Sequence, residues 1–162
     1  MRTIITFMLL AACGLAQAQQ TEYELKRDTP PTGSRMRVAG AKSSIPFDQP
    51  WEKLSREQQA EIMAPYESMG PGDEPPYPLN GTKKIWNAFV KASDLMRVHG
   101  HVRIIVEVNA EGKATSAQVY ATPDERVTRY VASVMMNERY KPARCKGQPC
   151  AQQYLFDGDW SL

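Results

Sequence analysis

The residues with the most reactive side chains lie in two short stretches of the sequence. Cys145 and Cys150 bracket the residues Lys-Gly-Gln-Pro near the end of the chain, and the two histidines, His99 and His101, precede them. This set could form a disulfide, a Cys₂His₂ zinc site or a thiol redox pair. Cys-x₄-Cys with His-x-His is not a usual zinc-finger spacing, and redox catalysis usually uses Cys-x-x-Cys. The choice depends on the compartment and on the elements that hold the two cysteines.

The N-terminal residues have the form of an export signal. Arg2 is followed by an apolar run over residues 4–15, which is shorter than the roughly 20 residues of a membrane-spanning helix. Small residues at 16–18 then provide a cleavage site, which predicts a signal peptide over residues 1–18. An alternative is a lipoprotein signal, because Leu-Ala-Ala-Cys ends at Cys13, whose lipidation would anchor the chain to a membrane. Either route leads to an oxidising compartment, where disulfides persist.

Length and charge limit the classes of protein that fit. About 140 residues remain after removal of the signal, a normal length for one domain with one core. The formal net charge is +2, and acidic and basic residues are interspersed without a basic stripe. Nucleic acid is therefore not expected as a partner.

The first half of the exported chain has weak structural signals apart from one helix. Residues 19–50 contain few large apolar residues and two turn-like clusters, which predicts an irregular tether. Residues 51–74 form a helical extension, in which Ser55 and Gln58 have the spacing of a capping box. Residues 70–78 are rich in proline and glycine and end it.

The second half has clear periodicity. A helix is predicted over residues 83–96 with Thr82 as its N-cap, and residues 101–109 alternate as a strand. A turn with Gly112 leads to a return strand over 114–121. Another helix is predicted next, with Thr122 as its N-cap, Pro123 as its first residue and Glu125 completing a capping box. Its buried side chains are expected at helical spacing, at Val127, Tyr130, Val131, Val134 and Met135. A last strand covers 151–158. This order predicts an α+β fold, with helices on one face of a small antiparallel sheet.

Several motifs occur together in the last part of the chain. Tyr77-Pro78 precedes a helix and the stretch HGHVRIIVEVNAEGKATSAQVY, and a second helix leads to RYKPARCKGQPCAQQYLF. Residues 75–158 resemble the C-terminal domain of TonB, the periplasmic energy-transducer protein of Gram-negative bacteria. That domain has an opening Tyr-Pro, a Gly-x-Val-x-Val-x-Val strand, an aromatic-x-Pro-Ala exit from its helix and a Gly-x-Pro turn before its last strand. The resemblance implies a TonB C-terminal-like domain over residues 75–162 of a periplasmic protein.

The resemblance also implies a mode of binding. In the family, an extended segment of an outer-membrane receptor adds as a strand to the edge of the sheet. The matching contact residues here are Gln152, Gln153, Tyr154, Leu155 and Phe156. We expect a transport-related binding module for an outer-membrane or other periplasmic protein, not an enzyme, with no metal or cofactor. Energy transduction is not carried over, because no histidine precedes His99 and the spacer is short. An alternative is a structural envelope protein that dimerises through this edge, and the N-terminal segment could also cover the edge.

The same resemblance places Cys145 and Cys150 on either side of the Gly-x-Pro turn. A four-residue loop would let them face each other across the mouth of a hairpin, at a separation that a disulfide can bridge. Together with the oxidising compartment, this favours a structural disulfide over the zinc site and the redox pair.

Overall fold

A computed structural model describes residues 23–25, 41–67 and 69–160. The predicted signal peptide, Cys13 and most of the predicted tether lie outside these residues. The elements, in chain order, are β1 (Tyr23–Leu25), β2 (Ala41–Ser43), the 3₁₀ helix η1 (Trp51–Lys53), α1 (Arg56–Met63), β3 (Tyr77–Pro78), α2 (Lys83–Met96), β4 (Gly100–Val108), β5 (Ala114–Ala121), α3 (Glu125–Met136), β6 (Tyr140–Lys141), β7 (Ala143–Cys145), β8 (Gln148–Cys150) and β9 (Gln152–Trp160).

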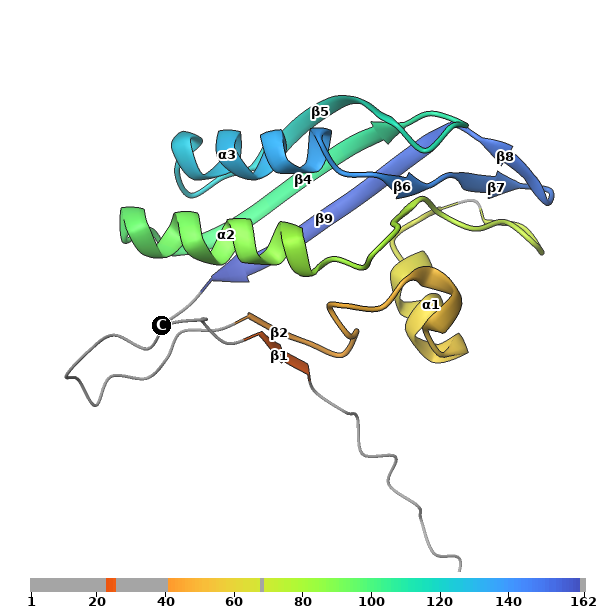
Figure 1. Ribbon diagram of the computed structural model, residues 1–162, viewed down its shortest axis with the longest axis horizontal. Helices are drawn as coiled ribbons and strands as arrows, with labels where there is room; N and C mark the ends of the chain where they lie inside the picture. Colours follow the sequence, from red (N-terminus) through yellow and green to blue (C-terminus); the bar gives the residue numbers. More distant parts are fainter. Residues whose placement is uncertain (1–22, 26–40, 68, 161–162) are drawn as a thin grey trace, which may run out of the picture.

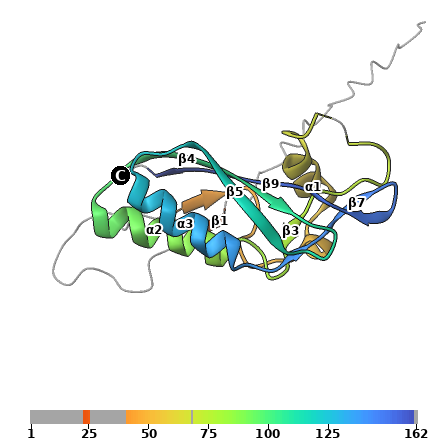
Figure 2. The same ribbon diagram turned by 90° about the horizontal axis from the view of Figure 1, so that it is seen from above.

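The fold is mixed α+β, as predicted. Its main sheet has the antiparallel order β5-β4-β9, and helices α2 and α3 pack together on one face of it (Figures 1 and 2). Strands β4 and β9 pair without a register shift over their whole length, from Gly100 opposite Trp160 to Val108 opposite Gln152. Strand β9 therefore lies at one edge of the sheet and β5 at the other.

The alternation of β4 explains its central place. Side chains on one face of a strand repeat every second residue, and a strand with neighbours on both sides can bury a whole apolar face. Four side chains of β4 face the helices and are at most 1% exposed: Val102, Ile104, Val106 and Val108. Helix α2 contributes Ile85, Phe89 and Ala92 to the same core, and α3 contributes Val127, Val131 and Met135.

Three expectations about α3 were wrong: its N-cap Thr122, its first residue Pro123 and the burial of Tyr130. Its N-cap is Asp124, whose carboxylate accepts a hydrogen bond from the Arg126 N–H, and Glu125 is the first helical residue. Thr122 instead accepts a hydrogen bond from the Asp124 N–H, two residues too early to cap the helix. Tyr130 is 44% exposed rather than buried, because the buried stripe follows Val127, Val131 and Met135 along one narrow line.

The other two caps differ in their outcome. The capping box of α1 is confirmed, with Ser55 and Gln58 exchanging hydrogen bonds between side chain and backbone. Thr82 occupies the N-cap position of α2, but its side chain makes no capping hydrogen bond.

Gly112 has the positive φ expected of the β4–β5 turn, and a Cβ there would lie 2.1 Å from the Tyr140 carbonyl oxygen. Among the described residues, none of the helices is both long and apolar enough to cross a membrane.

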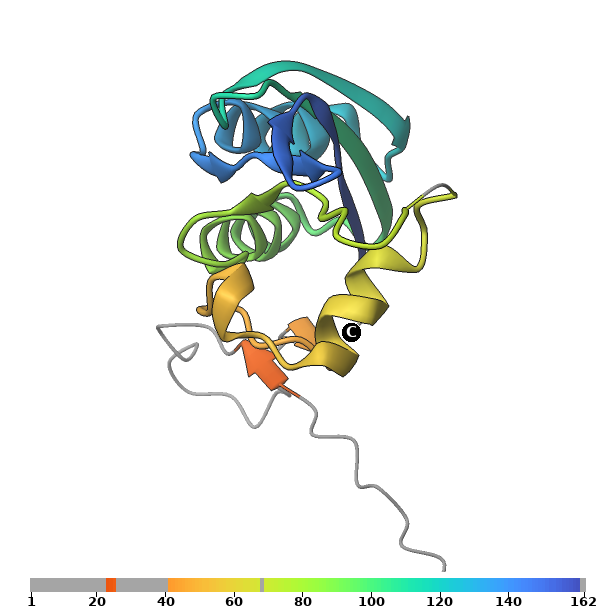
Figure 3. The ribbon, with the colours of Figure 1, turned by 90° about the vertical axis from the view of Figure 1, so that its right-hand side faces the viewer.

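Residues 43–66 form an N-terminal extension that lies beyond β9, on the side of the sheet away from β5 (Figures 1 and 3). Phe47, Trp51 and Leu54 of this extension are buried in the same hydrophobic core as the helices. The backbone N–H of Lys83, at the start of α2, donates to the Phe47 carbonyl oxygen at 2.7 Å. Gly81 permits this approach, since a Cβ at that position would lie 2.5 Å from the same oxygen.

The burial of α2 gives a direct test of the fold. Phe89 is fully buried against Trp86 and Phe156, whereas Leu95 on the same helix is 72% exposed. Phe89→Ala should lower the free energy of unfolding by about 3–5 kcal/mol, because it removes buried area and leaves a cavity. Leu95→Ala is the matched control and should change it by less than about 0.5 kcal/mol. Equal losses in urea unfolding would contradict the packing described here.

Candidate functional site

The edge of β9 is the part of the fold that carries the predicted contact residues. All five of them, Gln152, Gln153, Tyr154, Leu155 and Phe156, lie on this strand. Among the described residues, β4 is the only strand that pairs with β9. The other side of β9 is therefore an edge, whose backbone groups need partners outside the sheet.

The hydroxyl of Tyr66 shows which backbone groups of β9 face outward. Tyr66, just after α1, donates a hydrogen bond from its hydroxyl to the Gln153 carbonyl oxygen at 2.9 Å. In an antiparallel pair, successive residues of a strand alternate between facing the partner strand and facing away from it. Gln153, Leu155, Asp157 and Asp159 therefore present their N–H and C=O groups to the outer edge, while the residues between them bond to β4. Tyr66 covers one place on this edge.

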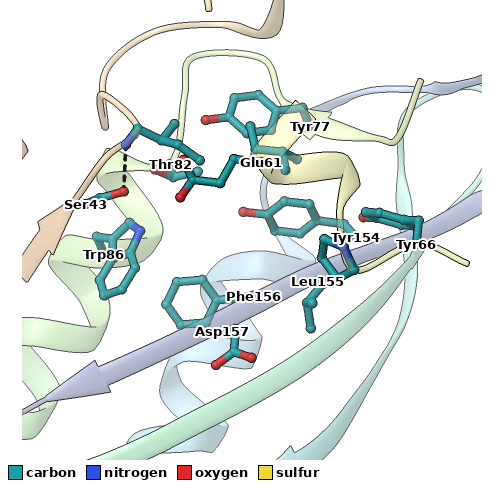
Figure 4. A pocket seen from close by; sticks show the side chains of 13 residues that line it. Ser43, Glu61, Tyr66, Tyr77, Thr82, Trp86, Tyr154, Leu155, Phe156 and Asp157 are labelled. Atoms are coloured by element: carbon teal, nitrogen blue, oxygen red, sulfur yellow. Dashed lines mark hydrogen bonds between the residues drawn. The ribbon is translucent and has the colours of Figure 1, made fainter. Parts of the chain in front are cut away.

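A pocket of about 280 Å³ lies along the same edge (Figure 4). It is lined by Tyr154, Leu155, Phe156 and Asp157, four consecutive residues of β9. Since successive side chains of a strand point to opposite faces, one pocket can touch all four only by lying along the edge. The opposite side is formed by the extension, through Ser43, Ile45, Glu61, Ile62, Pro65 and Tyr66, and the remaining lining residues are Tyr77, Thr82 and Trp86.

Aromatic rings form much of the pocket wall. Trp86 packs edge-on against Phe156 with ring centroids 5.1 Å apart, and also against Phe47 of the extension at 5.6 Å. A Cβ on Gly158 would lie 2.9 Å from the Trp86 ring, so the absence of a side chain at Gly158 lets the indole lie close to β9. Tyr77 contacts Tyr154 edge-on, with ring centroids 6.5 Å apart.

Burial raises the pKa of all three tyrosines that line the pocket, Tyr66, Tyr77 and Tyr154. Burial raises the pKa of Tyr77 to about 12, and the nearby Thr82 hydroxyl offsets part of that rise. The Tyr77 hydroxyl is buried and has no hydrogen-bond partner among the described residues. Burial likewise raises the pKa of Tyr66 to about 12, opposed by a hydrogen bond with the Leu155 backbone. The Tyr66 oxygen thus lies between the outward groups of Gln153 and Leu155, as a neighbouring strand would.

The extension is held in place by several polar contacts. Gln58 donates from its side chain to the Ser44 carbonyl oxygen, and Gln59 donates to that of Trp51. The Ser44 hydroxyl donates to the Glu61 carboxylate at 2.5 Å. These contacts tie α1 to the segment that precedes it, which positions Glu61 and Tyr66 opposite β9.

On the face of the sheet away from the helices, charged residues pair across β4 and β9. His101 lies with one ring nitrogen 3.1 Å from Asp157 and the other 3.1 Å from Asp159. The Arg103 guanidinium also donates to Asp157, through Nε at 2.8 Å. His101 is thus engaged by two carboxylates, while His99 is exposed.

The two cysteines form a disulfide, with their Cα atoms 5.9 Å apart. Both sulfurs are used in this bond, which leaves no thiolate for the zinc alternative. The hairpin has a two-residue turn, Lys146-Gly147, instead of the expected four-residue loop, and both turn residues have positive φ. Cys145 is therefore paired with Gln148 in the β7–β8 register, and the disulfide joins Cys145 diagonally to Cys150 on the neighbouring strand. Two consecutive positive φ angles are typical of a tight two-residue hairpin turn. The Asp73 carboxylate fixes this turn by accepting from the Lys146 N–H at 2.6 Å.

Comparison of the chain with protein-family models, with curated proteins and with solved structures finds no match. The geometry of the β9 edge and its pocket is therefore the basis for inferring function. The described residues contain no group of three or more histidine, cysteine, aspartate or glutamate side chains that could hold a metal ion.

The sequence predicts β9 and offers the N-terminal segment as a cover for its edge, but it does not predict the pocket between them. The sequence places Glu61 and Tyr66 in a helical extension and Tyr77 in a Tyr-Pro motif, without indicating that they meet at one pocket. The sequence predicts Tyr66 as a docking residue, but no local signal indicates its partner Gln153, which is 87 residues away. Around the α1 capping box, the docking residues predicted from the sequence indicate that the extension packs against the domain: Trp51, Leu54, Ile62, Met63 and Tyr66.

The raised tyrosine pKa values predict a loss of stability in alkali. In the folded chain the pKa of Tyr66 and of Tyr77 lies above the usual 10. The contribution of these protonated hydroxyls to the free energy of unfolding is therefore complete below about pH 10 and is lost as the pH rises toward 12. Tyr66→Phe should make this loss shallower, whereas Tyr120→Phe, at an exposed position on β5, should not. Circular dichroism and tyrosinate absorbance against pH provide the measurement. Ionisation of every tyrosine near pH 10 with the fold intact would contradict the prediction.

Proposed function

We propose that this chain is a binding module of the bacterial envelope, which recognises an extended segment of an outer-membrane or periplasmic protein by adding it as a strand to β9. The observation that carries the proposal is the outward backbone of Asp157 and Asp159, beside a pocket and without a neighbouring strand among the described residues. An edge of this kind binds extended peptides through main-chain hydrogen bonds, and pockets for alternate side chains give selectivity. The resemblance of residues 75–158 to the TonB C-terminal domain supports the same mode.

The contact with Tyr66 shifts the proposed binding stretch along the strand. The Gln153 carbonyl oxygen already accepts a hydrogen bond from the Tyr66 hydroxyl. The added segment would therefore pair beside residues 155–159, about three positions further along the strand than the sequence alone implied. There it would run between β9 and the extension, in contact with Ser43 and Ile45 on its other side.

The position of the extension also bears on the dimer alternative. Two sheets that pair edge to edge must bring their β9 strands within about 5 Å of each other. Helix α1 and Tyr66 lie in front of that edge, so a second copy would have to displace them. A narrow peptide segment needs less room, which favours strand addition by a partner over self-pairing.

The proposed compartment is the periplasm. The disulfide Cys145–Cys150 is compatible with an oxidising environment, where such bonds persist. The export signal expected over residues 1–18 would deliver the chain there, either free or attached to a membrane through a lipid on Cys13.

Backbone recognition makes a prediction that side-chain recognition does not. Asp157→Pro removes one outward N–H from the edge, and proline is tolerated on an edge strand. In an NMR titration of the isotope-labelled chain with short peptides from the N-terminal segments of TonB-dependent receptors, the wild type should show shifts on residues 155–159. Asp157→Pro should weaken binding about tenfold or more, since it removes a hydrogen bond and adds a steric conflict.

The control is Asp157→Ala, which also removes the carboxylate but keeps the N–H. It should bind the same peptides within about twofold of the wild type, because a mostly solvent-screened ion pair contributes little. Equal loss in both variants would show that the carboxylate, not the backbone, mediates recognition. Absence of any shift on β9 at millimolar peptide would overturn the proposal, and a concentration-dependent dimer with the same shifts would favour self-association.

A further inference from the structure

We propose that the pocket beside β9 receives a positively charged side chain, arginine or lysine, from the segment that pairs with this strand. This inference rests on the proposed function and adds the chemistry of the partner. A strand that adds to β9 must present alternate side chains to the two faces of the sheet. One of them, on the helix face beside Phe156, would point into the pocket between Trp86 and Glu61 (Figure 4).

The charge of the pocket favours a cation. Its 13 lining residues include two carboxylates, Glu61 and Asp157, and no lysine, arginine or histidine. Asp157 is already engaged by Arg103 and His101 on the other face of the sheet. Glu61 comes from α1, across the pocket from β9, and its exposed carboxylate accepts one hydrogen bond from the Ser44 hydroxyl, which leaves its charge and its other acceptor sites for a ligand. An incoming guanidinium or ammonium would meet this carboxylate first.

The walls favour a cation as well. Aromatic faces attract cations, tryptophan most strongly and then tyrosine. The aromatic residues of the pocket are Trp86, Tyr66, Tyr77, Tyr154 and Phe156. The chain already uses this interaction nearby, where the Lys141 ammonium lies 5.2 Å from the ring centroid of Trp51.

At the inner end, a polar atom is available to the ligand. The buried Tyr77 hydroxyl lines the pocket near the Thr82 hydroxyl and makes no hydrogen bond of full geometry among the described residues (Figure 4). A hydroxyl oxygen accepts hydrogen bonds from ammonium and guanidinium groups. Leaving a buried hydroxyl without a partner is unfavourable, so a bound cationic side chain would remove that penalty. Neither a purely apolar nor an acidic side chain would satisfy both Glu61 and Tyr77.

The test compares two short peptides of alternating valine and threonine that differ only at their central residue. One carries arginine and the other citrulline, which has nearly the same shape without the charge. Both are titrated into the isotope-labelled chain by NMR. The arginine peptide should bind about tenfold more tightly, from one ion pair together with one cation–aromatic contact, with shifts on Trp86, Tyr77 and residues 155–159. Added salt should reduce the difference.

Two variants locate the effect. Glu61→Gln should reduce the preference for arginine to about threefold or less without changing the affinity for citrulline. Glu52→Gln is the matched control, since Glu52 is an exposed carboxylate of the same extension that does not line the pocket, and it should leave both affinities unchanged. Tyr77→Phe should weaken the arginine peptide only.

The outcomes separate the two proposals. Equal affinity for both peptides, with shifts on β9, would overturn the charged-side-chain inference and leave strand addition standing. An arginine preference that Glu61→Gln and Glu52→Gln reduce equally would overturn it too, because it would reflect net charge rather than the pocket. Absence of β9 shifts with either peptide would overturn both proposals.

Discussion

An edge strand presents backbone N–H and C=O groups that must find partners, and this constraint at β9 organises the rest of the molecule. Strand β4 satisfies one side of β9 over its full length. On the other side, the extension places the Tyr66 hydroxyl against the Gln153 carbonyl, in the position that a neighbouring strand would take. The extension reaches that point because Phe47 and Trp51 are buried in the core and Gly81 lets the Phe47 backbone approach the start of α2. Fold, extension and pocket are therefore parts of one arrangement around the β9 edge.

The pocket follows from the shape of the extension. Helix α1 is short and lies across from β9 without pairing with it, so the two enclose a space instead of a continuous sheet. Core packing supplies the walls, because Trp86 and Phe156 belong both to the hydrophobic cluster under the helices and to the pocket. Selectivity would then come from a few polar atoms added to an aromatic surface. Glu61 is supplied by the extension and the Tyr77 hydroxyl by the domain, so neither part alone makes the site.

Local sequence signals predicted the helices and the strands of the main sheet well, for physical reasons. The alternation of Val102, Ile104, Val106 and Val108 marked β4 because a central strand buries one entire face. Helix α2 was predicted with its bounds, and the capping box of α1 was correct. The sequence did not decide the N-cap of α3, because two nearby residues could each cap that helix. Thr122 and Asp124 are both good capping residues, and only the backbone conformation selects Asp124. Contacts between distant segments had no local signal, which is why the pairing of Tyr66 with Gln153 and the pocket were missed.

Strand addition requires the outer edge of β9 to be unpaired beyond Tyr66, and amide hydrogen exchange of the free chain tests this requirement most directly. We expect an alternating pattern along the strand. The N–H groups of Asp157 and Asp159 should exchange rapidly with solvent, while those of Tyr154, Phe156 and Gly158, which face β4, and that of Leu155, beside Tyr66, should exchange slowly. Uniformly slow exchange through Asp159 would mean that another segment or another copy of the chain already pairs with this edge, and would contradict an open binding edge.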